Sequence, residues 1–301
     1  MTDISDIKAT ARDLILPEST DDDLIAEMQK RGYVAHKPEP AKKPVKFDLS
    51  RLSGSRIRLG VISDTHFGSK FQQPTYLREH LAYMKKQRVD AICFAGDVTD
   101  GGTKMHPGFE YETFSHGADA QEEEAADILI PEAERLRVPW YVIGGNHDNS
   151  HYKQGGIDIV ERLCRRSDWF NYLSPGLGNA RNSVGFIRIG RLLVEICHPH
   201  MGSAYAWSYR GQKWIEALSP ENKPHLVLMG NFHKPLQMDY RNIHYLMLPA
   251  YQSQSSWMAS KSLVSTVGSA ILEVGTEPMG LSPSIKLEWL IERVPREKDW
   301  G

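Results

Sequence analysis

Apolar residues follow two different spacings along the first half of this 301-residue chain. Short, continuous apolar runs rich in β-branched residues predict buried strands at residues 58–63, 91–95 and 140–143. Between these runs, residues 74–88 and 120–136 carry apolar side chains at helical spacing. Because β-α-β units cross over with one hand, this order predicts a parallel sheet flanked by helices.

The second half of the chain has a different pattern. Apolar runs with little helix between them predict strands at 184–189, 192–197, 225–229, 243–248, 268–274 and 284–289. Residues 205–218 have the spacing of a helix. Two β-rich halves with helices outside predict an α/β fold in which two sheets pack face to face.

The first 56 residues differ from the rest in composition. An acidic run after Thr20 predicts the beginning of a helix, and Gly32 suits its end. Residues 36–46 contain three prolines and four lysines and predict an extended linker. We therefore expect a small helical appendage with its linker at residues 1–56 and one large domain at residues 57–301.

Composition limits the classes of partner and compartment. The chain has 36 Lys and Arg against 38 Asp and Glu, which excludes a global basic field but not a local basic groove. No stretch approaches the roughly 18 apolar residues that a membrane span needs, so we expect no membrane partner. The three cysteines form no CxxC pair and the first residues lack an apolar signal core, so we expect a reducing, cytoplasmic location.

Five predicted strands are followed directly by residue types that bind metal ions. These clusters are Asp64-Thr65-His66, Gly96-Asp97-Val98-Thr99-Asp100, Gly144-Gly145-Asn146-His147-Asp148, His198-Pro199-His200 and Gly230-Asn231-Phe232-His233. Because the carboxyl ends of strands in an open α/β sheet converge on one crevice, we expect these clusters to lie together. Carboxylates, amide oxygens and imidazoles suit divalent ions such as Mn²⁺, Fe²⁺ or Zn²⁺. Two such ions about 3.5–4 Å apart can clamp the attacking and leaving oxygens of phosphoryl transfer.

The series DTH, GDVTD, GNHD, a histidine at a strand end and GNFH resembles the calcineurin-like metallophosphoesterase superfamily. The usual pattern of that family is DxH, GDxxD, GNH[DE], H and GHxH, and the resemblance covers roughly residues 57–290. Residues 198–234 further resemble phage and bacterial members, some of them grouped with nucleases. The resemblance implies a four-layer α/β/β/α sandwich of two mixed sheets that holds two divalent metal ions. Mn²⁺ is favoured, with Fe²⁺, Zn²⁺ and Mg²⁺ as alternatives.

The resemblance also implies roles for single residues. The first ion would be held by Asp64, His66, His233 and a bridging Asp97. The second ion would be held by the same Asp97 together with Asn146 and His198, which is preferred over His200 because it directly follows the strand. His147 would be the general acid that protonates the leaving oxygen, or would stabilise the phosphate, and the carboxylate of Asp100 would orient its ring.

One position departs from the family pattern, because Asn231 stands where the family has histidine. An amide oxygen suits Mn²⁺, Fe²⁺ or Zn²⁺ less well than imidazole does, so Asn231 is expected to be a weak last ligand of the second ion. Either the chain works with a weakened second site or the asparagine replaces a natural histidine. The sequence leaves both readings open.

Two further expectations concern the surroundings of the site. The Gly-rich insert at residues 101–118, which contains His106 and His116, is a candidate cover for the site. Asp148 is expected to cap a turn rather than to meet a cation.

The expected function is hydrolysis of a phosphodiester bond in nucleic acid by a DNA nuclease. Besides the resemblance, it rests on scattered Lys and Arg and on aromatic residues after the ligands. These aromatics are Tyr205, Trp207, Tyr209, Tyr251 and Trp257, which suit either base stacking or the core. One alternative is a phosphatase or phosphodiesterase for a small molecule or a protein. Another is a non-catalytic binding subunit with a weakened second metal site. The oligomeric state stays open.

Overall fold

The computed structural model describes residues 44–52, 54–102, 105–173, 183–218, 223–277 and 283–300, together with Glu27 and Lys30. The chain divides into two units, Met1–Lys42 and Lys43–Gly301. The helix predicted after Thr20 lies outside the described residues, apart from Glu27 and Lys30, which are helical. The second unit contains both sheets.

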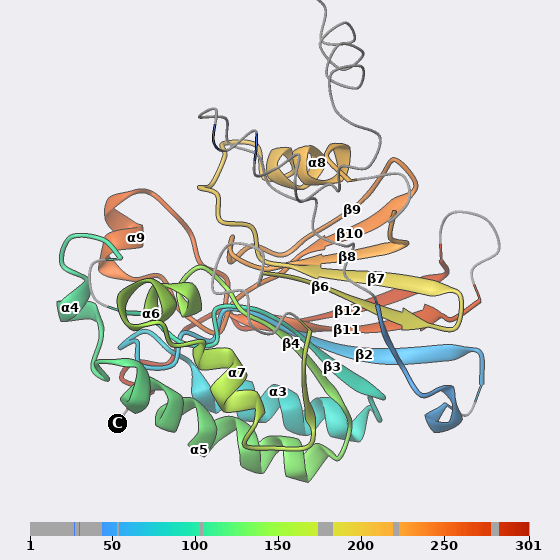
Figure 1. The fold of residues 1–301 in the computed structure, drawn as a ribbon, viewed down its shortest axis with the longest axis horizontal. Helices are drawn as coiled ribbons and strands as arrows, with labels where there is room; N and C mark the ends of the chain where they lie inside the picture. Colours follow the sequence, from blue (N-terminus) through green and yellow to red (C-terminus); the bar gives the residue numbers. More distant parts are fainter. Residues whose placement is uncertain are drawn as a thin grey trace, which may run out of the picture. The chain divides into compact units, whose positions relative to one another are not determined.

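The first sheet has six strands in the order β12-β11-β2-β3-β4-β5 (Figure 1). Its parallel part consists of β2 (Arg56–Ile62), β3 (Ala91–Ala95), β4 (Trp140–Ile143) and β5 (Phe170–Tyr172). The helices between these strands are α3 (Pro74–Lys86), α4 (Phe109–Glu112), α5 (Ala118–Leu136), α6 (Asp148–Gly155) and α7 (Ile159–Cys164). The predicted β-α-β-α-β order with parallel strands is thus confirmed.

The last two strands join this first sheet. β11 (Gly268–Gly275) pairs antiparallel with β2, and β12 (Ile285–Ile291) pairs antiparallel with β11. The sequence placed both strands with the second half of the chain. That grouping was wrong, because local periodicity identifies a strand but not a partner at the other end of the domain.

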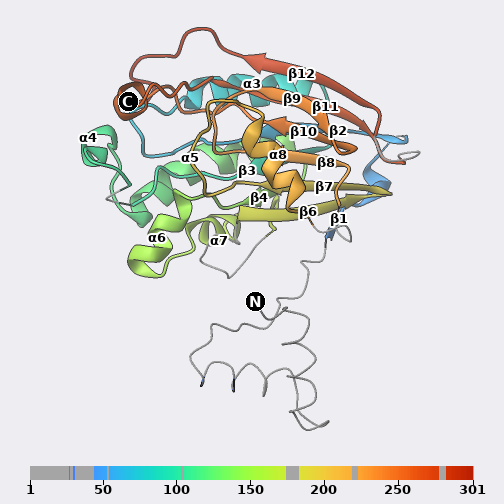
Figure 2. The same cartoon turned by 90° about the horizontal axis from the view of Figure 1, so that it is seen from above.

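The second sheet is also mixed and has the order β1-β6-β7-β8-β10-β9. Its strands from the second half of the chain are β6 (Val184–Ile189), β7 (Leu192–Cys197), β8 (Leu226–Met229), β9 (Leu236–Tyr240) and β10 (Ile243–Met247). Helix α8 (Tyr209–Glu216) contacts β10 from outside, as the view from above shows (Figure 2). The short helix α9 (Ser256–Ser260) follows β10.

The second unit begins before the predicted boundary at residue 56. β1 (Val45–Lys46) pairs parallel with β6, a short 3-10 helix (Leu49–Arg51) follows it, and the side chain of Phe47 is buried between the sheets. Pro44 directly precedes β1, which lies at the edge of its sheet, where a missing backbone N–H is tolerated. Part of the segment expected to be a linker therefore belongs to the large unit.

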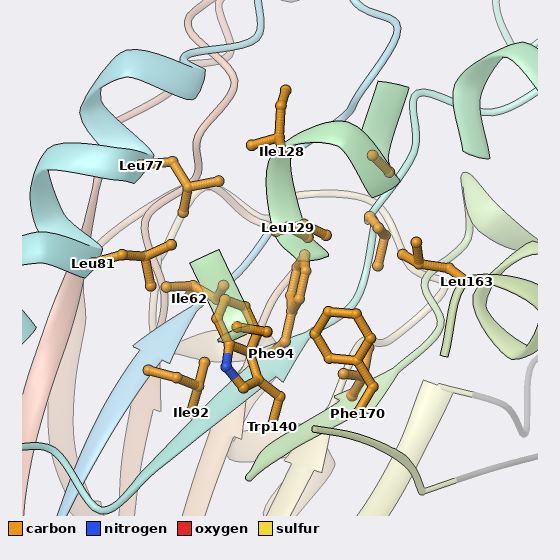
Figure 3. Packing of buried hydrophobic residues seen from close by; sticks show 14 of the residues in the cluster. Ile62, Leu77, Leu81, Ile92, Phe94, Ile128, Leu129, Trp140, Leu163 and Phe170 are labelled. Carbon is orange, nitrogen blue, oxygen red and sulfur yellow. The ribbon is translucent and has the colours of Figure 1, made fainter. Parts of the chain in front are cut away.

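Three layers of buried apolar side chains hold the four layers of elements together. In the first, Leu77 and Leu81 of α3 and Leu129 of α5 pack over the strands of the first sheet, with Trp140 at the centre (Figure 3). The second layer lies between the sheets, where Leu59 of β2 belongs to the same cluster as residues of β6, β7, β8 and β10. The third lies under α8. The α/β/β/α sandwich of two mixed sheets is confirmed.

The helices α4, α6 and α9 gather at one end of the two sheets, at the left of Figure 1. The loops that leave β2, β3, β4, β7 and β8 carry the predicted ligands. In the part of the chain that the structure describes, no helix is both long and apolar enough to cross a bilayer.

Candidate metal centre

The turns that leave the strands run beside one another. Asp64 donates its backbone N–H to the Gly96 carbonyl at 3.0 Å, and His66 donates to the Asp97 carbonyl at 3.1 Å. Five predicted site residues adopt left-handed backbone, with φ between 47° and 79°: Asp64, His66, Asp97, Asn231 and His233. This conformation costs of order 1–3 kcal/mol for a residue with a side chain, and such strain clusters at functional sites.

Two glycines let these turns approach closely. A Cβ atom on Gly145 would lie 2.0 Å from Oδ1 of Asp97. A Cβ atom on Gly230 would lie 2.3 Å from the Ala95 carbonyl oxygen and 2.8 Å from Nδ1 of His198. Neither position has room for a side chain, so the glycines are part of how the ligands are brought together.

Three groups of side chains have the spacing of metal ligands; His66, Asp100 and His147 form one of them, and the other two are fully buried and consist of predicted ligands. Of these two, one contains Asp64, His66 and His233, the other contains Asp64, Asp97 and His198, and the ligand atoms within each group lie within 4.8 Å of one another. His233 Nε2 is 3.1 Å from Asp64 Oδ1, and His198 Nε2 is 3.0 Å from Asp97 Oδ2. Of the aspartates, it is Asp64 that is common to both groups.

The family resemblance assigns the bridging role to Asp97. Its carboxylate also reaches both groups. Its Oδ2 atom lies 3.7 Å from Nε2 of His66 as well as 3.0 Å from Nε2 of His198. Asn146 joins the second group, with Oδ1 3.1 Å from the same His198 nitrogen. The structure therefore brings six of the predicted ligands together, although which carboxylate bridges stays a prediction.

Three imidazoles are held in the tautomer that suits metal binding. Nδ1 of His198 donates to the Ala95 carbonyl at 2.7 Å. Nδ1 of His66 contacts the Asp100 carboxylate at 3.2 Å. Because the Ser265 hydroxyl donates to the Gln252 carbonyl, its oxygen accepts from Nδ1 of His233 at 3.1 Å. In a neutral ring each Nε2 then carries a lone pair, which faces the carboxylates.

A lone pair facing a carboxylate is unfavourable unless a positive charge lies between them. Burial lowers the pKa of His66, but Asp100 and Asp64 raise it, to about 10. Burial opposes protonation of His198 too, but Asp97 and Asp64 raise its pKa to about 9. The buried Nε2 of His66 has no hydrogen-bond partner among the described residues. The buried carboxylates thus favour positive charge at this place, and divalent metal ions would supply it.

The contacts of Asp100 differ from those expected. Its backbone carbonyl, not its carboxylate, accepts from Nδ1 of His147. The carboxylate instead holds His66 and accepts from Thr113 Oγ1 at 2.8 Å and Gln252 Nε2 at 3.2 Å. The expectation that the Asp100 carboxylate orients His147 is therefore wrong in the atom it names. The carboxylate contacts the metal-facing ring of His66, although one of its oxygens also lies within 4.8 Å of a ring nitrogen of His147.

Asp148 does more than cap one turn. Its carboxylate accepts from the backbone N–H groups of Val98 at 3.1 Å, Thr99 at 2.9 Å and Gly145 at 2.9 Å. Burial and the neighbouring Asp97 charge raise its pKa to about 6. Asp148 therefore joins the turn after β3 to the turn after β4, and it meets no Lys or Arg in the described structure.

The side chain of Asn231 is occupied outside the metal cluster. Its Nδ2 atom donates to the Met201 carbonyl at 2.9 Å, while its backbone N–H donates to the Asp64 carboxylate at 3.1–3.2 Å. His200 lies beside the cluster, where its Nε2 is 2.7 Å from the Ser183 hydroxyl. These contacts place both residues next to the ligands and leave a ligand role for Asn231 as a prediction.

A pocket of about 630 Å³ opens over the cluster. Part of its lining is apolar and comes from the insert and the α9 region: Met105, Phe109, Trp257, Met258 and Leu263. Other lining residues are polar: Lys153, Gln154, His200 and Ser203. The insert thus borders the site. His106 stacks on Trp257 with ring centroids 4.6 Å apart, and the Trp257 backbone N–H donates to Glu112 at 2.7 Å.

Several residues with a role in this site carried no sequence signal. Ser265, Gln252 and Thr113 hold ligands in place, yet serine, glutamine and threonine are ordinary loop residues. Among the aromatics considered for base stacking, Tyr251 is 1% exposed and belongs to the core. Trp257 lies in the pocket wall instead.

Residues 57–251 match the family model of calcineurin-like phosphoesterases. The chain is 30% identical over 133 residues to a protein named probable glycerophosphodiester phosphodiesterase GpdQ from Arcobacter nitrofigilis. That match covers 38% of this chain and 36% of the relative, so the chain spans about a third of the relative's length.

Similar solved structures include one described as a novel archaeal phosphodiesterase, with a TM-score of 0.40 and 11% identity over 77% of this chain and 100% of that one. Another is Vps29 from Entamoeba histolytica in complex with Zn²⁺, with a TM-score of 0.39 and 14% identity over 78% of this chain and 99% of that one.

Proposed function

The chain belongs to the calcineurin-like phosphoesterase family, and on that premise we propose that it is a dinuclear metal-dependent phosphodiesterase that cleaves nucleic-acid strands. The observation that carries the proposal is the pocket over the cluster, because its lining combines apolar and polar residues. A phosphodiester has two substituents that can meet these different residues, whereas a phosphomonoester has only one.

Two divalent ions, of which Mn²⁺ suits the mixed donor set best, would occupy the two groups of side chains. The first would be held by Asp64, His66 and His233, and the second by Asp97, Asn146 and His198. When bound, such ions supply the Lewis acidity that stabilises charge on the phosphate and activates water for attack.

His147 has the position of a proton donor to the leaving oxygen. Its Nδ1–H donates to the Asp100 carbonyl, so the ring is fixed and Nε2 is the atom left for the substrate. The ring lines the pocket beside the metal-facing histidines, with its centroid 4.5 Å from that of His66. As an imidazolium, His147 would release the Nε2 proton to the departing alkoxide.

The mixed lining suits a nucleotide linkage. The apolar residues can cover a base or a sugar, while Lys153 forms no ion pair with a carboxylate among the described residues and can meet the next phosphate. By contrast, Arg162 and Arg166, farther along the chain, are both paired with carboxylates. A cation beside the pocket favours a polyanion over a small diester that carries a single charge.

Separate substrates test the proposal. With Mn²⁺ present, the protein should cleave bis(p-nitrophenyl) phosphate and DNA, but not p-nitrophenyl phosphate. Lys153→Ala should raise KM for DNA, while Lys86→Ala, which removes an exposed lysine at the end of α3, should leave it unchanged. Hydrolysis of the monoester alone would contradict the proposal.

A second candidate is a diesterase for small glycerophosphodiesters. It is favoured by the 133-residue match to the glycerophosphodiester phosphodiesterase named above. Release of glycerol phosphate from such diesters at a higher kcat/KM than the cleavage of DNA would favour this candidate. Inertness toward every substrate would favour the non-catalytic subunit.

A further inference from the structure

Three exposed aromatic side chains lie between the end of β7 and the first residue of α8, which is Tyr209. Tyr205 is fully exposed, and Trp207 and Tyr209 are 43% and 46% exposed. Large aromatic side chains are normally buried, where they contribute most to stability. Three of them at the surface within five residues indicate a ligand with flat, stackable faces.

Cations lie against two of these rings. Lys234 Nζ is 5.1 Å from the centroid of the Trp207 ring, and Arg210 Cζ is 5.8 Å from that of Tyr209. Both distances fall within the range of cation–π attraction. Neither cation has a carboxylate partner in the described parts of the chain. Exposed aromatic rings and two cations without a carboxylate partner therefore lie together here, with Lys234 itself 7% exposed beneath the Trp207 ring.

The same loop is fixed to the turn that carries a metal ligand. Asn231 Nδ2 donates to the Met201 carbonyl at 2.9 Å, and Lys234 Nζ lies 3.4 Å from the Ser203 hydroxyl. Met201 and Ser203 themselves line the pocket over the cluster. A ligand stacked on Trp207 would thus be held in register with the metal centre rather than at an unrelated surface.

We propose that residues 201–209, which we name the platform loop, stack the bases of a single nucleic-acid strand whose backbone continues into the metal pocket. The inference rests on the proposed nuclease function and names its substrate class. Base stacking on aromatic side chains next to cations binds single strands with little sequence preference. A duplex keeps its bases stacked internally and does not offer their faces.

A binding assay tests this inference separately from catalysis. Full-length protein in EDTA, which holds back cleavage, is titrated into a fluorescein-labelled 20-nucleotide oligothymidylate, and anisotropy is recorded. Trp207→Ala should weaken the affinity by about tenfold, as the loss of a base–aromatic stack does. Trp207→Phe should retain most of it. Tyr205→Ala, at a fully exposed position with no folding role, should also weaken binding.

Two controls show whether a loss of affinity in Trp207→Ala comes from base stacking. An abasic oligonucleotide of the same length keeps the phosphates but lacks bases, so Trp207→Ala should not change its affinity. Tyr111→Ala removes an aromatic side chain that is 76% exposed on α4 and should not change oligothymidylate binding. Equal losses for both oligonucleotides, or for both variants, would overturn the inference, as would oligothymidylate that does not bind.

The proposed nuclease function is tested separately, by measuring cleavage of DNA in the presence of Mn²⁺. Cleavage of DNA by the wild type with unchanged binding in Trp207→Ala and Tyr205→Ala refutes the platform but not the nuclease. Base-dependent binding without cleavage of any nucleic acid refutes the nuclease but not the platform.

Discussion

Glu195 is a buried carboxyl group that belongs to neither group of metal ligands. It should make the free energy of unfolding depend on pH. It lies on β7 with 0% exposure, and Oε1 accepts from the indole N–H of Trp214 on α8 at 2.6 Å. Oε2 has no partner among the described residues. Burial raises the pKa of Glu195 to about 7, although the Trp214 hydrogen bond lowers it.

The direction of this pH dependence follows from the number of protons that the folded and the unfolded state bind. Between the ordinary pKa near 4.5 and the folded value near 7, the folded state holds a proton that the unfolded state has released. Stability therefore falls as pH rises through this window and is flat above it. The difference between the folded and the ordinary pKa corresponds to about 3 kcal/mol of folding stability, an order-of-magnitude figure.

Glu195→Gln removes the titration and retains the acceptor for Trp214. Free energies of unfolding from urea titrations, followed by circular dichroism, are compared at pH 5 and pH 8. The variant should gain stability relative to the wild type between these values, by about 2–3 kcal/mol. Any constant cost of the buried amide cancels in that comparison. An equal difference between the two proteins at both pH values would show that the folded carboxyl is already ionised.

Three further substitutions test the metal site. His147→Ala should lower turnover on the order of 100-fold or more while Mn²⁺ content, measured by mass spectrometry, stays nearly intact; collapse of the metal content would reassign the residue. Asn231→His should raise Mn²⁺ affinity and metal-dependent turnover in Mn²⁺ titrations of diester hydrolysis, and no gain would remove position 231 from the second site. Gly145→Ala should abolish tight Mn²⁺ binding, because its Cβ would lie 2.0 Å from Asp97, whereas Gly155→Ala meets nothing closer than 3.7 Å and should bind normally.

The elements buried on both sides were the most predictable. β3 and β4 have the bounds that the apolar runs gave, because every side chain in them is buried and the run ends where the polar turn begins. The clusters at the strand ends were predictable for a related reason. Parallel strands force their following loops to one edge, so the sequence order of the motifs becomes a spatial group.

Features that depend on distant partners were not predictable. β1 has two residues and owes its existence to pairing with β6. β9 is only partly buried, so its apolar signal is weak. The direction of the Asp100 carboxylate could not be foreseen, because Thr113 and Gln252 fix it from loops that carry no motif.

Titration of Mn²⁺ into metal-stripped protein by calorimetry tests the metal centre most directly. We expect one tight and one weaker site per chain in the wild type, and loss of both in Asp97→Ala, because Asp97 reaches both groups of ligands. The absence of saturable binding, or binding that survives in Asp97→Ala, would contradict the metal centre on which the proposed hydrolysis depends.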